Sequence, residues 1–306
     1  MGLLVEGKWV DRWYDTGKAG GAFERGQSQF RKGVTADGRS GFKAEAGRYH
    51  LYLAMACPWC HRALLMRALK QLDAAIGVSF VEPLMLEEGW VFPSPDPVTG
   101  AMRAHEIYAM ADPGYTGRVT VPILWDKKTN TIVNNESSEI IRMLNREFGD
   151  FTDDATDYYP ADLAARIDVI NARVYDTVNN GVYKAGFATR QEPYEAAVRA
   201  LFQSLDWLEA MLATRRFLLG DRLTEADIRL FPTLARFDAV YYGHFKCNLR
   251  HVYEYPALWR YTREIYAMPG VAATVDLAVF KAHYYGSHKT INPSGVIPLG
   301  PAIDFG

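Results

Sequence analysis

The stretch 51-LYLAMACPWCHRALLMRALK-70 contains two of the three cysteines of this 306-residue chain. The residues that lead up to Cys57 alternate and are apolar or aromatic, which is typical of a strand. After Pro58 the apolar side chains recur at helical spacing, at Leu65, Ala68 and Leu69. Pro58 itself suits a first helical turn, where no amide donor is needed. The stretch therefore predicts a strand that leads into a helix, with Cys57 at the junction.

The next hundred residues predict how this unit continues. Residues 78–83, VSFVEP, have the pattern of a second strand, whereas Leu84 to Arg118 show no clear period. A loop of that length inside a compact domain is usually functional. Residues 119–148 indicate strand, turn, strand and helix, with Ser137 or Ser138 as the helix cap. This order predicts a mixed sheet with helices on its faces, in a domain that spans residues 46–153.

The two ends of the chain differ from this unit. Residues 1–45 are rich in Gly, Lys, Arg and Gln and predict an extended arm. After a polar linker, residues 161–306 predict an all-helical domain, whose Pro- and Gly-rich tail from Ala282 wraps back over the body. Thr224 and Asp227 are spaced as a capping box. The predicted helices are Ala161 to Asn180, Gln191 to Ala213, Thr224 to Tyr241 and Ala257 to Ala267.

Composition excludes several classes of protein. The net charge of −2 provides no general attraction to nucleic acid or to an anionic membrane surface. No apolar run approaches the roughly 18 residues of a spanning helix, and the first residues contain no apolar core of a signal peptide. Three cysteines cannot form a disulfide framework. We therefore expect a cytoplasmic protein, in which a C-x-x-C pair is more often catalytic or metal-binding than structural.

The C-x-x-C word of Cys57 and Cys60 has three interpretations. A zinc site would need two more ligands at suitable spacing, but Cys247 is isolated and the seven histidines are scattered, so we expect no metal. Two thiols packed as small hydrophobic groups would not require so particular an arrangement of strand, C-P-x-C and helix. A reactive thiol at a helix start fits best, because the exposed amides and the helix dipole favour the thiolate.

Two further motifs suggest what this thiol acts on. Val121-Pro122 starts the third predicted strand, and a cis bond there would let the backbone of Val121 pair with an extended peptide. Glu136 and Ser137 precede a helix, whose amides suit a carboxylate while the Glu136 side chain suits an ammonium. The combination predicts a peptide-sized site with one sulfur-reactive end and one zwitterionic end, which glutathione fits.

With these motifs in view, the chain resembles the glutathione transferases, and more narrowly the glutathionyl-hydroquinone reductases of the xi class. The resemblance extends over most of the chain. It implies a thioredoxin-like N-terminal domain and an all-helical C-terminal domain in a homodimer. The stretches that support it include ACPWCHRALL (56–65), EEGWVF (87–92), the segment 118–145, FLLGDRLTEADIRLFPTLARFD (217–238), NNGVYKAGFA (179–188) and HYYGSHKTINPSGVIPLGP (283–301).

The resemblance also implies roles for single residues. Cys57 would be the catalytic thiol. Tyr183, Tyr284 and Tyr285 match tyrosines of an aromatic substrate pocket, and we expect Tyr183 and Tyr285 to donate protons, although the sequence does not say which of Tyr284 and Tyr285 points inward. Glutathione would be held by Trp90 stacking over it, Arg118 on a carboxylate, Val121 through its backbone, and Glu136 and Ser137 at the γ-glutamyl end.

The implied activity is the reduction of glutathionyl-hydroquinones with glutathione as co-substrate, through a mixed disulfide between Cys57 and glutathione. Cys60 makes the C-P-W-C word resemble a dithiol glutaredoxin, which leaves its part in resolving that disulfide open; we expect a packed bystander. Two other functions also stay open. One is a conventional transferase that conjugates glutathione to electrophiles, and the other is a non-catalytic ligand-binding scaffold of the same fold.

Overall fold

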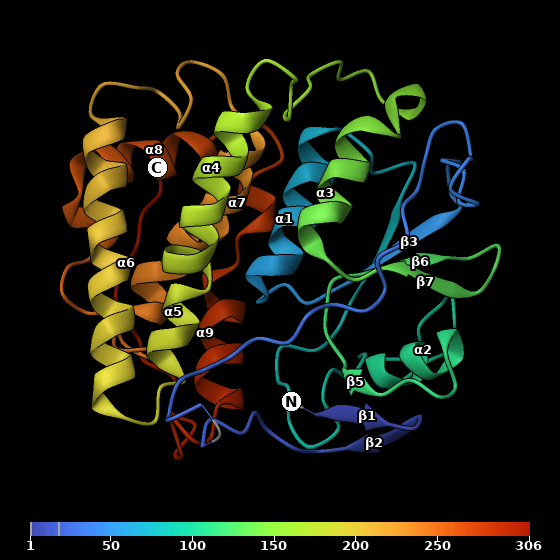
Figure 1. The fold of residues 1–306 in the computed structure, drawn as a ribbon, viewed down its shortest axis with the longest axis horizontal. Helices are drawn as coiled ribbons and strands as arrows, with labels where there is room; N and C mark the ends of the chain where they lie inside the picture. The colour runs from blue at the N-terminus through green and yellow to red at the C-terminus, as the bar shows by residue number, and fades with distance from the viewer. Residues whose placement is uncertain (1, 18) are drawn as a thin grey trace. The chain divides into compact units, whose positions relative to one another are not determined.

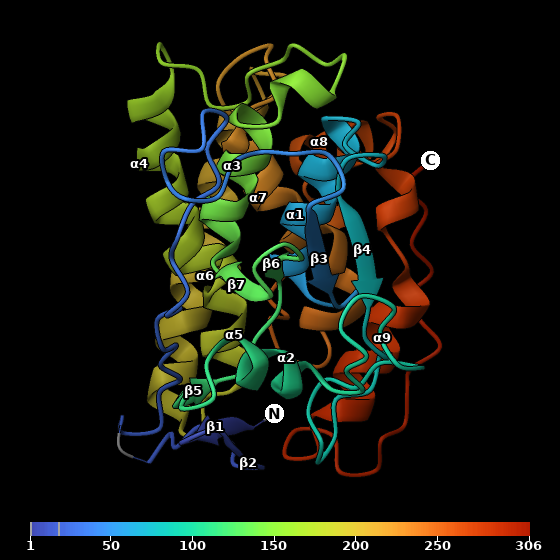
Figure 2. The same ribbon diagram turned by 90° about the vertical axis from the view of Figure 1, so that its right-hand side faces the viewer.

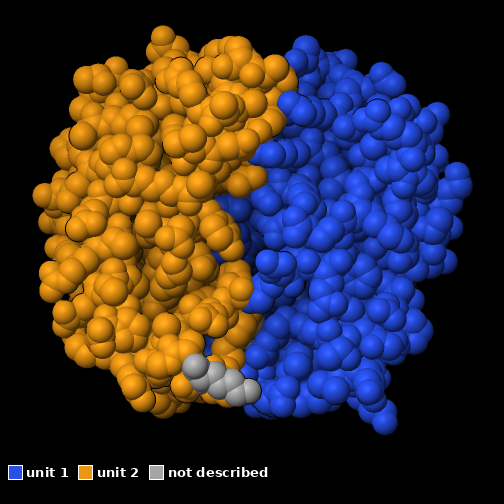
Figure 3. All heavy atoms as spheres, viewed as in Figure 1, with its two compact units in different colours: residues 1–13, 26–156 blue, residues 14–25, 157–306 orange. Residues whose placement is uncertain are grey.

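The computed structural model describes residues 2–17 and 19–306. The chain divides into two compact units, which Figure 3 shows in different colours. Unit 1 comprises Met1–Trp13 and Gly26–Thr156, and unit 2 comprises Tyr14–Arg25 and Asp157–Gly306. Among the residues that the structure describes, no helix combines the length and the apolar character that crossing a bilayer would require.

Unit 1 is built on a four-stranded mixed sheet, which confirms the predicted architecture. Figure 2 shows its strands in the order β4 (Gly77–Phe80), β3 (Tyr49–Leu53), β6 (Ile123–Asp126) and β7 (Thr131–Asn134). Strands β3 and β4 are parallel because a helix connects them, whereas β6 pairs antiparallel with both β3 and β7. All of β3 is buried, so it forms the centre of this sheet.

Two helices of unit 1 begin near the predicted site. Helix α1 (Pro58–Leu69) follows β3, and α3 (Ser137–Arg146) follows β7. They pack against each other and run side by side in Figure 1. The N-cap of α3 is Glu136, whose side chain accepts a hydrogen bond from the Ser138 amide, so the predicted cap at Ser137 or Ser138 is wrong. The longer Glu side chain reaches the same amide from one residue earlier. A 3-10 turn, Gly149–Phe151, follows.

The structure adds detail to the predicted arm and corrects the predicted loop of unit 1. The extended arm contains the strands β1 (Leu3–Val5) and β2 (Lys8–Val10), which form a small antiparallel sheet with β5 (Gly117–Arg118). The segment predicted to be a loop contains helix α2 (Ala104–Ala111). Strands of three residues and a helix of eight are too short to show a period in the sequence.

Unit 2 is helical, as predicted, but two of the predicted helices are interrupted. The segment 161–180 contains α4 and then a π-helical turn, and the segment 224–241 contains α7 and another π-helical turn. The predicted tail also begins in helix α9 rather than in loop. The helices are α4 (Ala164–Val174), α5 (Gly181–Gly186), α6 (Gln191–Leu212), α7 (Glu225–Arg236), α8 (Pro256–Tyr266) and α9 (Leu277–Ser287), with π-helical turns at Tyr175–Asn179 and Phe237–Tyr241 and 3-10 turns at Val252–Glu254 and Ala272–Thr274.

The capping box at the start of α7 is confirmed. The Thr224 amide donates to Asp227 Oδ2 at 2.8 Å, and the Thr224 side chain accepts from the Asp227 amide. Asp227 is fully buried and also accepts hydrogen bonds from the Leu218 amide and the Tyr261 hydroxyl. The same aspartate that helps to cap α7 therefore also links α7 to Leu218 and to Tyr261 of α8 in the core of unit 2.

Candidate active site

Cys57 lies where the sequence predicts it, at the junction of β3 and α1. It is the N-cap of α1, with an extended backbone (φ −78°, ψ 122°) and with Pro58 as the first helical residue. Its Sγ lies 3.7 Å from the carbonyl oxygen of Val121, as a donor to that oxygen. The side chain is 8% exposed, at the end of the helix where the amides of the first turn point outward. The thiol therefore lies at the start of α1 and against the backbone of Val121.

Cys60 has different surroundings although it lies only one helical turn further on. It is 1% exposed, and its Sγ accepts a hydrogen bond from the Ala54 amide at 3.4 Å. Its sulfur therefore faces the connection between β3 and α1, whereas the sulfur of Cys57 faces Val121. The two thiols of the C-x-x-C word are not equivalent. Among the residues that the structure describes, no group of three or more His, Cys, Asp or Glu side chains is placed to hold a metal ion.

Val121 lies two residues before the start of β6 and is buried. The peptide bond between Val121 and Pro122 is cis, which confirms the sequence prediction. The fold thus brings Val121 next to Cys57, although 64 positions separate the two residues in the chain. A thiol and a backbone segment that can pair with a peptide lie side by side.

Glu136 and Ser137 form the start of α3. One oxygen of the Glu136 carboxylate accepts from the Ser138 amide and hydroxyl, at 3.2 and 2.9 Å, and the other accepts from the Ser28 hydroxyl at 3.2 Å. Ser137 is 3% exposed, and its hydroxyl accepts from the Arg62 guanidinium at 3.4 Å. Arg62 belongs to α1, so a buried cation joins the start of α3 to the helix that begins at Cys57.

Trp90 and Arg118 are held by other parts of unit 1. Trp90 is 6% exposed in the segment between β4 and α2, where its carbonyl accepts from the Ala104 amide at 2.9 Å. The Arg118 guanidinium donates to the carbonyl oxygen of Arg12 and, at 2.9 Å, to that of Trp13. The arm therefore fixes the direction of the Arg118 side chain, a role that the sequence analysis did not predict.

The segment that carries Trp90 is organised by Asp96, which the sequence analysis also missed. The buried Asp96 carboxylate accepts from the hydroxyls of Tyr52 (2.8 Å), Ser79 (2.7 Å) and Thr99 (2.8 Å), and from the amides of Val98 and Thr99. Burial alone would raise the pKa of Asp96, but these hydrogen bonds together hold it below its usual range. The signal in the sequence was an aspartate between prolines and just before Thr-Gly, a pattern of side-chain-capped turns.

A cluster of tyrosines lies in unit 2. The hydroxyl of Tyr183 lies 2.5 Å from that of Tyr284, and the hydroxyl of Tyr241 lies 3.0 Å from that of Tyr284. Tyr284 is 1% exposed and Tyr183 is 9% exposed. The Arg25 guanidinium lies 5.0 Å from the centre of the Tyr183 ring. Three hydroxyls thus form a chain whose most accessible member is Tyr183.

Tyr285 points elsewhere. Its ring packs against the imidazole of His244, with ring centres 4.7 Å apart. Consecutive residues of a helix point about 100° apart, so only one of two neighbouring tyrosines can meet Tyr183. In unit 2 it is Tyr284 that does so. Tyr241 was not predicted, because on a core-facing helix a tyrosine cannot be told from ordinary packing.

A pair of buried histidines borders the tyrosine cluster. Nε2 of His244 lies 3.0 Å from Nδ1 of His288. Burial, with Lys246 and His283 nearby, lowers the pKa of His244 from 6.5 to about 4. Burial, with His283 and His244, also lowers the pKa of His288. Both imidazoles are therefore neutral at pH 7.

This pair predicts a loss of stability in acid. Because the folded-state pKa of His244 lies below its unfolded value, the unfolded chain binds more protons as the pH falls from 6.5 toward 4. The stability that depends on neutral His244 is therefore fully present above pH 6.5 and is lost as the pH falls from 6.5 toward 4. At pH 5, His244 should lower the free energy of unfolding by roughly 2 kcal/mol. Urea unfolding at pH 7.5 and pH 5 measures this, and the difference should shrink in His244→Gln; an undiminished difference would contradict it.

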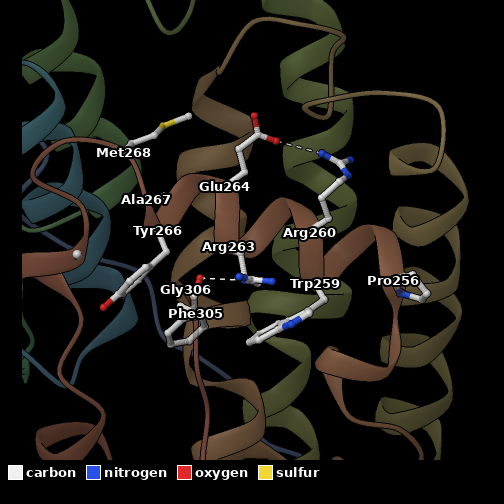
Figure 4. Close-up of a pocket in the computed structure, with 11 residues that line it drawn as sticks. Pro256, Trp259, Arg260, Arg263, Glu264, Tyr266, Ala267, Met268, Phe305 and Gly306 are labelled. Atoms are coloured by element: carbon white, nitrogen blue, oxygen red, sulfur yellow. Dashed lines mark hydrogen bonds and ion pairs between the residues drawn. The ribbon is translucent and has the colours of Figure 1, made fainter.

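Unit 2 also contains an open groove of about 760 Å³, shown in Figure 4, which none of the predicted site residues lines. It runs along α8, and the last two residues of the chain help to line it. Phe305 packs against the rings of Trp259 and Tyr266, and Arg263 Nε donates to the Phe305 carbonyl at 3.0 Å. The end of the chain therefore forms part of the wall of this groove, and none of the clustered tyrosines lines it.

Two domain families match this chain. Residues 56–147 match the glutathione S-transferase N-terminal domain, and residues 191–264 match the glutathione S-transferase C-terminal domain. The first range contains Cys57, Trp90, Arg118, Val121, Glu136 and Ser137. The second contains the capping box of α7 and Tyr241.

Whole proteins and solved structures are similar over nearly the full length. The glutathionyl-hydroquinone reductase PcpF of Sphingobium chlorophenolicum is 57% identical, over 99% of this chain and 97% of that protein. The glutathione-bound structure of YqjG, a glutathione transferase homolog from Escherichia coli K-12, is 49% identical over 99% of this chain and 97% of that chain, with a TM-score of 0.90. A xi-class enzyme from Natrialba magadii is 45% identical over 100% of this chain and 94% of that chain, with a TM-score of 0.93. The chain belongs to the glutathione transferase family, in its xi class of glutathionyl-hydroquinone reductases.

Proposed function

We propose that this protein reduces glutathionyl-hydroquinones to hydroquinones with glutathione as the co-substrate. The observation that carries the proposal is the Cys57 thiol at the start of α1, beside the backbone of Val121. A Tyr or Ser hydroxyl at that place could only stabilise a glutathione thiolate, whereas a Cys thiolate can bond to the glutathione sulfur. The relative PcpF, which carries the same activity in its name, supports this choice.

The proposed reaction has two steps. First, the Cys57 thiolate attacks the sulfur of the glutathionyl-hydroquinone. A disulfide bond forms between Cys57 and glutathione, the bond from sulfur to the ring carbon breaks, and its electron pair passes to the ring, whose carbon takes up a proton. Second, the thiolate of another glutathione attacks this mixed disulfide, which releases oxidised glutathione and restores the Cys57 thiolate.

Glutathione would bind in unit 1 as a short extended peptide. We assign its backbone pairing to Val121, its γ-glutamyl ammonium to the Glu136 carboxylate and its γ-glutamyl carboxylate to Ser137 at the start of α3. Trp90 would stack over the bound peptide, and Arg118 would pair with the other carboxylate. The 3.4 Å hydrogen bond between Arg62 and Ser137 supports this assignment, because it links the γ-glutamyl end to the helix of the thiol.

The ring needs a proton because an aryl carbon is a poor leaving group until the ring takes a ketone-like form. We assign this donor role to Tyr183. The 2.5 Å distance between the hydroxyls of Tyr183 and Tyr284 supports Tyr284 as the partner of Tyr183, in place of Tyr285, whose ring packs on His244.

We further propose that the enzyme works in the cytoplasm as a homodimer. The three buried cysteines support the cytoplasm, and the exposed Val169 and Tyr175 of unit 2 support the homodimer.

One pair of assays tests the proposed activity. The wild-type enzyme should convert a glutathionyl-hydroquinone to its hydroquinone and release one oxidised glutathione per turnover, as followed by chromatography. The same preparation should conjugate glutathione to a chloronitrobenzene slowly or not at all. Strong conjugation without any reduction would replace the proposal with a conventional transferase, and absence of both activities would favour a ligand-binding scaffold.

The variant Tyr183→Phe tests the proton donor. We expect it to lower kcat for the reduction by about a hundredfold or more, because general acid catalysis usually contributes at least that factor. Formation of the mixed disulfide from oxidised glutathione should stay normal, since that step needs no proton on a ring. Tyr285→Phe should change kcat far less. An equal loss of kcat in both variants would show that the hydrogen bond to Tyr284 does not single out Tyr183 as the proton donor.

A further inference from the structure

One stretch of the N-terminal arm, residues 28–35, lies beside the end of β7, where Arg31 and Asn134 form an isolated antiparallel bridge. The Lys32 amide donates to the Val133 carbonyl at 3.0 Å, and the Asn135 amide donates to the Phe30 carbonyl at 3.1 Å. The Asn134 side chain donates to the Lys32 carbonyl at 2.9 Å. The arm thus pairs with the backbone up to the residue before Glu136, so it fixes the loop that leads into α3.

Side chains of the same stretch reach the start of α3. The Arg31 guanidinium makes two hydrogen bonds to the Glu139 carboxylate, in the first turn of α3. The Ser28 hydroxyl lies 3.2 Å from Oε2 of Glu136 and 3.3 Å from the Asn135 carbonyl oxygen. The Ser138 groups already occupy the other oxygen of Glu136. With donors on both oxygens, the Glu136 carboxylate has a single favoured orientation.

A second stretch of the arm, residues 2–13, holds Arg118. Leu3 of β1 pairs with Arg118 of β5, and the carbonyls of Arg12 and Trp13 accept from its guanidinium. Two separate stretches of the arm therefore contact the residues proposed for the two carboxylate-bearing ends of glutathione. A brace that only stabilised unit 1 would have no need to reach these particular side chains.

We propose that the arm is part of the glutathione site, in which Ser28 is a positioning residue for Glu136 and the carbonyls of Arg12 and Trp13 position Arg118. The inference rests on the proposed function, because it takes the glutathione subsites from there. The physical reason is preorganisation: a carboxylate or guanidinium that is already oriented loses less conformational entropy when the ligand binds. Without Ser28, the Ser138 groups would hold only one oxygen of Glu136, and the second oxygen would lose its hydroxyl donor.

The test is the affinity for glutathione, measured by titration calorimetry on the full-length protein. Ser28→Ala should weaken binding by about tenfold, the lower end of the effect of one hydrogen bond to a charged group. The KM for glutathione should rise by the same factor, while kcat at saturating glutathione and the Tm stay unchanged. Ser28→Thr, which keeps the hydroxyl, should restore the affinity. The control is Arg39→Ala, which removes an exposed partner of Asp37 further along the arm and should change nothing.

Two results would overturn the inference. One is an unchanged glutathione affinity in Ser28→Ala. The other is a fall in kcat and Tm together with the rise in KM, unrestored by Ser28→Thr, which would show that the arm only stabilises unit 1. The calorimetric measurement needs no hydroquinone substrate, so it is separate from the proposed function. A wild-type protein that binds glutathione but reduces no glutathionyl-hydroquinone would defeat that function while still allowing this test.

Discussion

Cys57→Ala is expected to abolish the reduction of glutathionyl-hydroquinones, with a fall in kcat/KM on the order of 10⁴ or more. The physical reason is that Cys57 supplies the nucleophile. Neither water nor the methyl group of alanine can form the mixed disulfide with glutathione. After incubation with oxidised glutathione, mass spectrometry should find one glutathione on the wild type and none on Cys57→Ala.

Cys60→Ala is the matched control, since it makes the same chemical change one helical turn further on. It removes a buried sulfur that accepts from the Ala54 amide, so a modest loss of stability, about 1 kcal/mol, is expected. Its activity and its glutathione adduct should stay within a few-fold of the wild type. Activity retained in Cys57→Ala but lost in Cys60→Ala would reverse the two roles. Slow release of the adduct in Cys60→Ala would assign it a part in resolving the mixed disulfide.

Asp96→Ala should cause the largest loss of stability, about 4 kcal/mol in the free energy of unfolding. The substitution leaves the donors of Tyr52, Ser79, Val98 and Thr99 without their acceptor. Each unsatisfied buried donor costs about 1–3 kcal/mol, and water that enters the site recovers part of this cost. Urea unfolding at pH 7 measures the change, because Asp96 is ionised there.

Two variants make this result specific. Asp96→Asn keeps one acceptor oxygen and the shape of the side chain, so it should lose about half as much as Asp96→Ala. Asp153→Ala removes an exposed aspartate of unit 1 and should lose less than about 0.5 kcal/mol. A loss below 1 kcal/mol in Asp96→Ala would show that water replaces the carboxylate. The loop that carries Trp90 would then be held by its backbone hydrogen bonds alone.

Much of the fold could be predicted from local patterns. The alternation before Cys57 and the helical spacing after it specify a strand and a helix within a few residues, and Thr224 with Asp227 specifies a helix start. The elements that were missed are short or depend on distant partners. Strand β1 pairs with β5, which lies more than a hundred residues away in the chain, and β2 pairs with β1. Helix α2 has only about two turns.

The candidate site divides in the same way. The amino-acid sequence by itself determined the residue types and their order: a thiol before a proline at a helix start, a Val-Pro before a strand, and an acidic and a hydroxyl side chain at another helix start. Only the tertiary structure decided that Cys57 faces Val121 while Cys60 faces Ala54, and that Tyr284 rather than Tyr285 meets Tyr183. The reason is that spacing along a helix gives the angle between two side chains, but the direction in which either points depends on contacts with residues far away in the chain. The arm has no period of its own, and its place beside Glu136 and Arg118 is likewise set by strands elsewhere in unit 1.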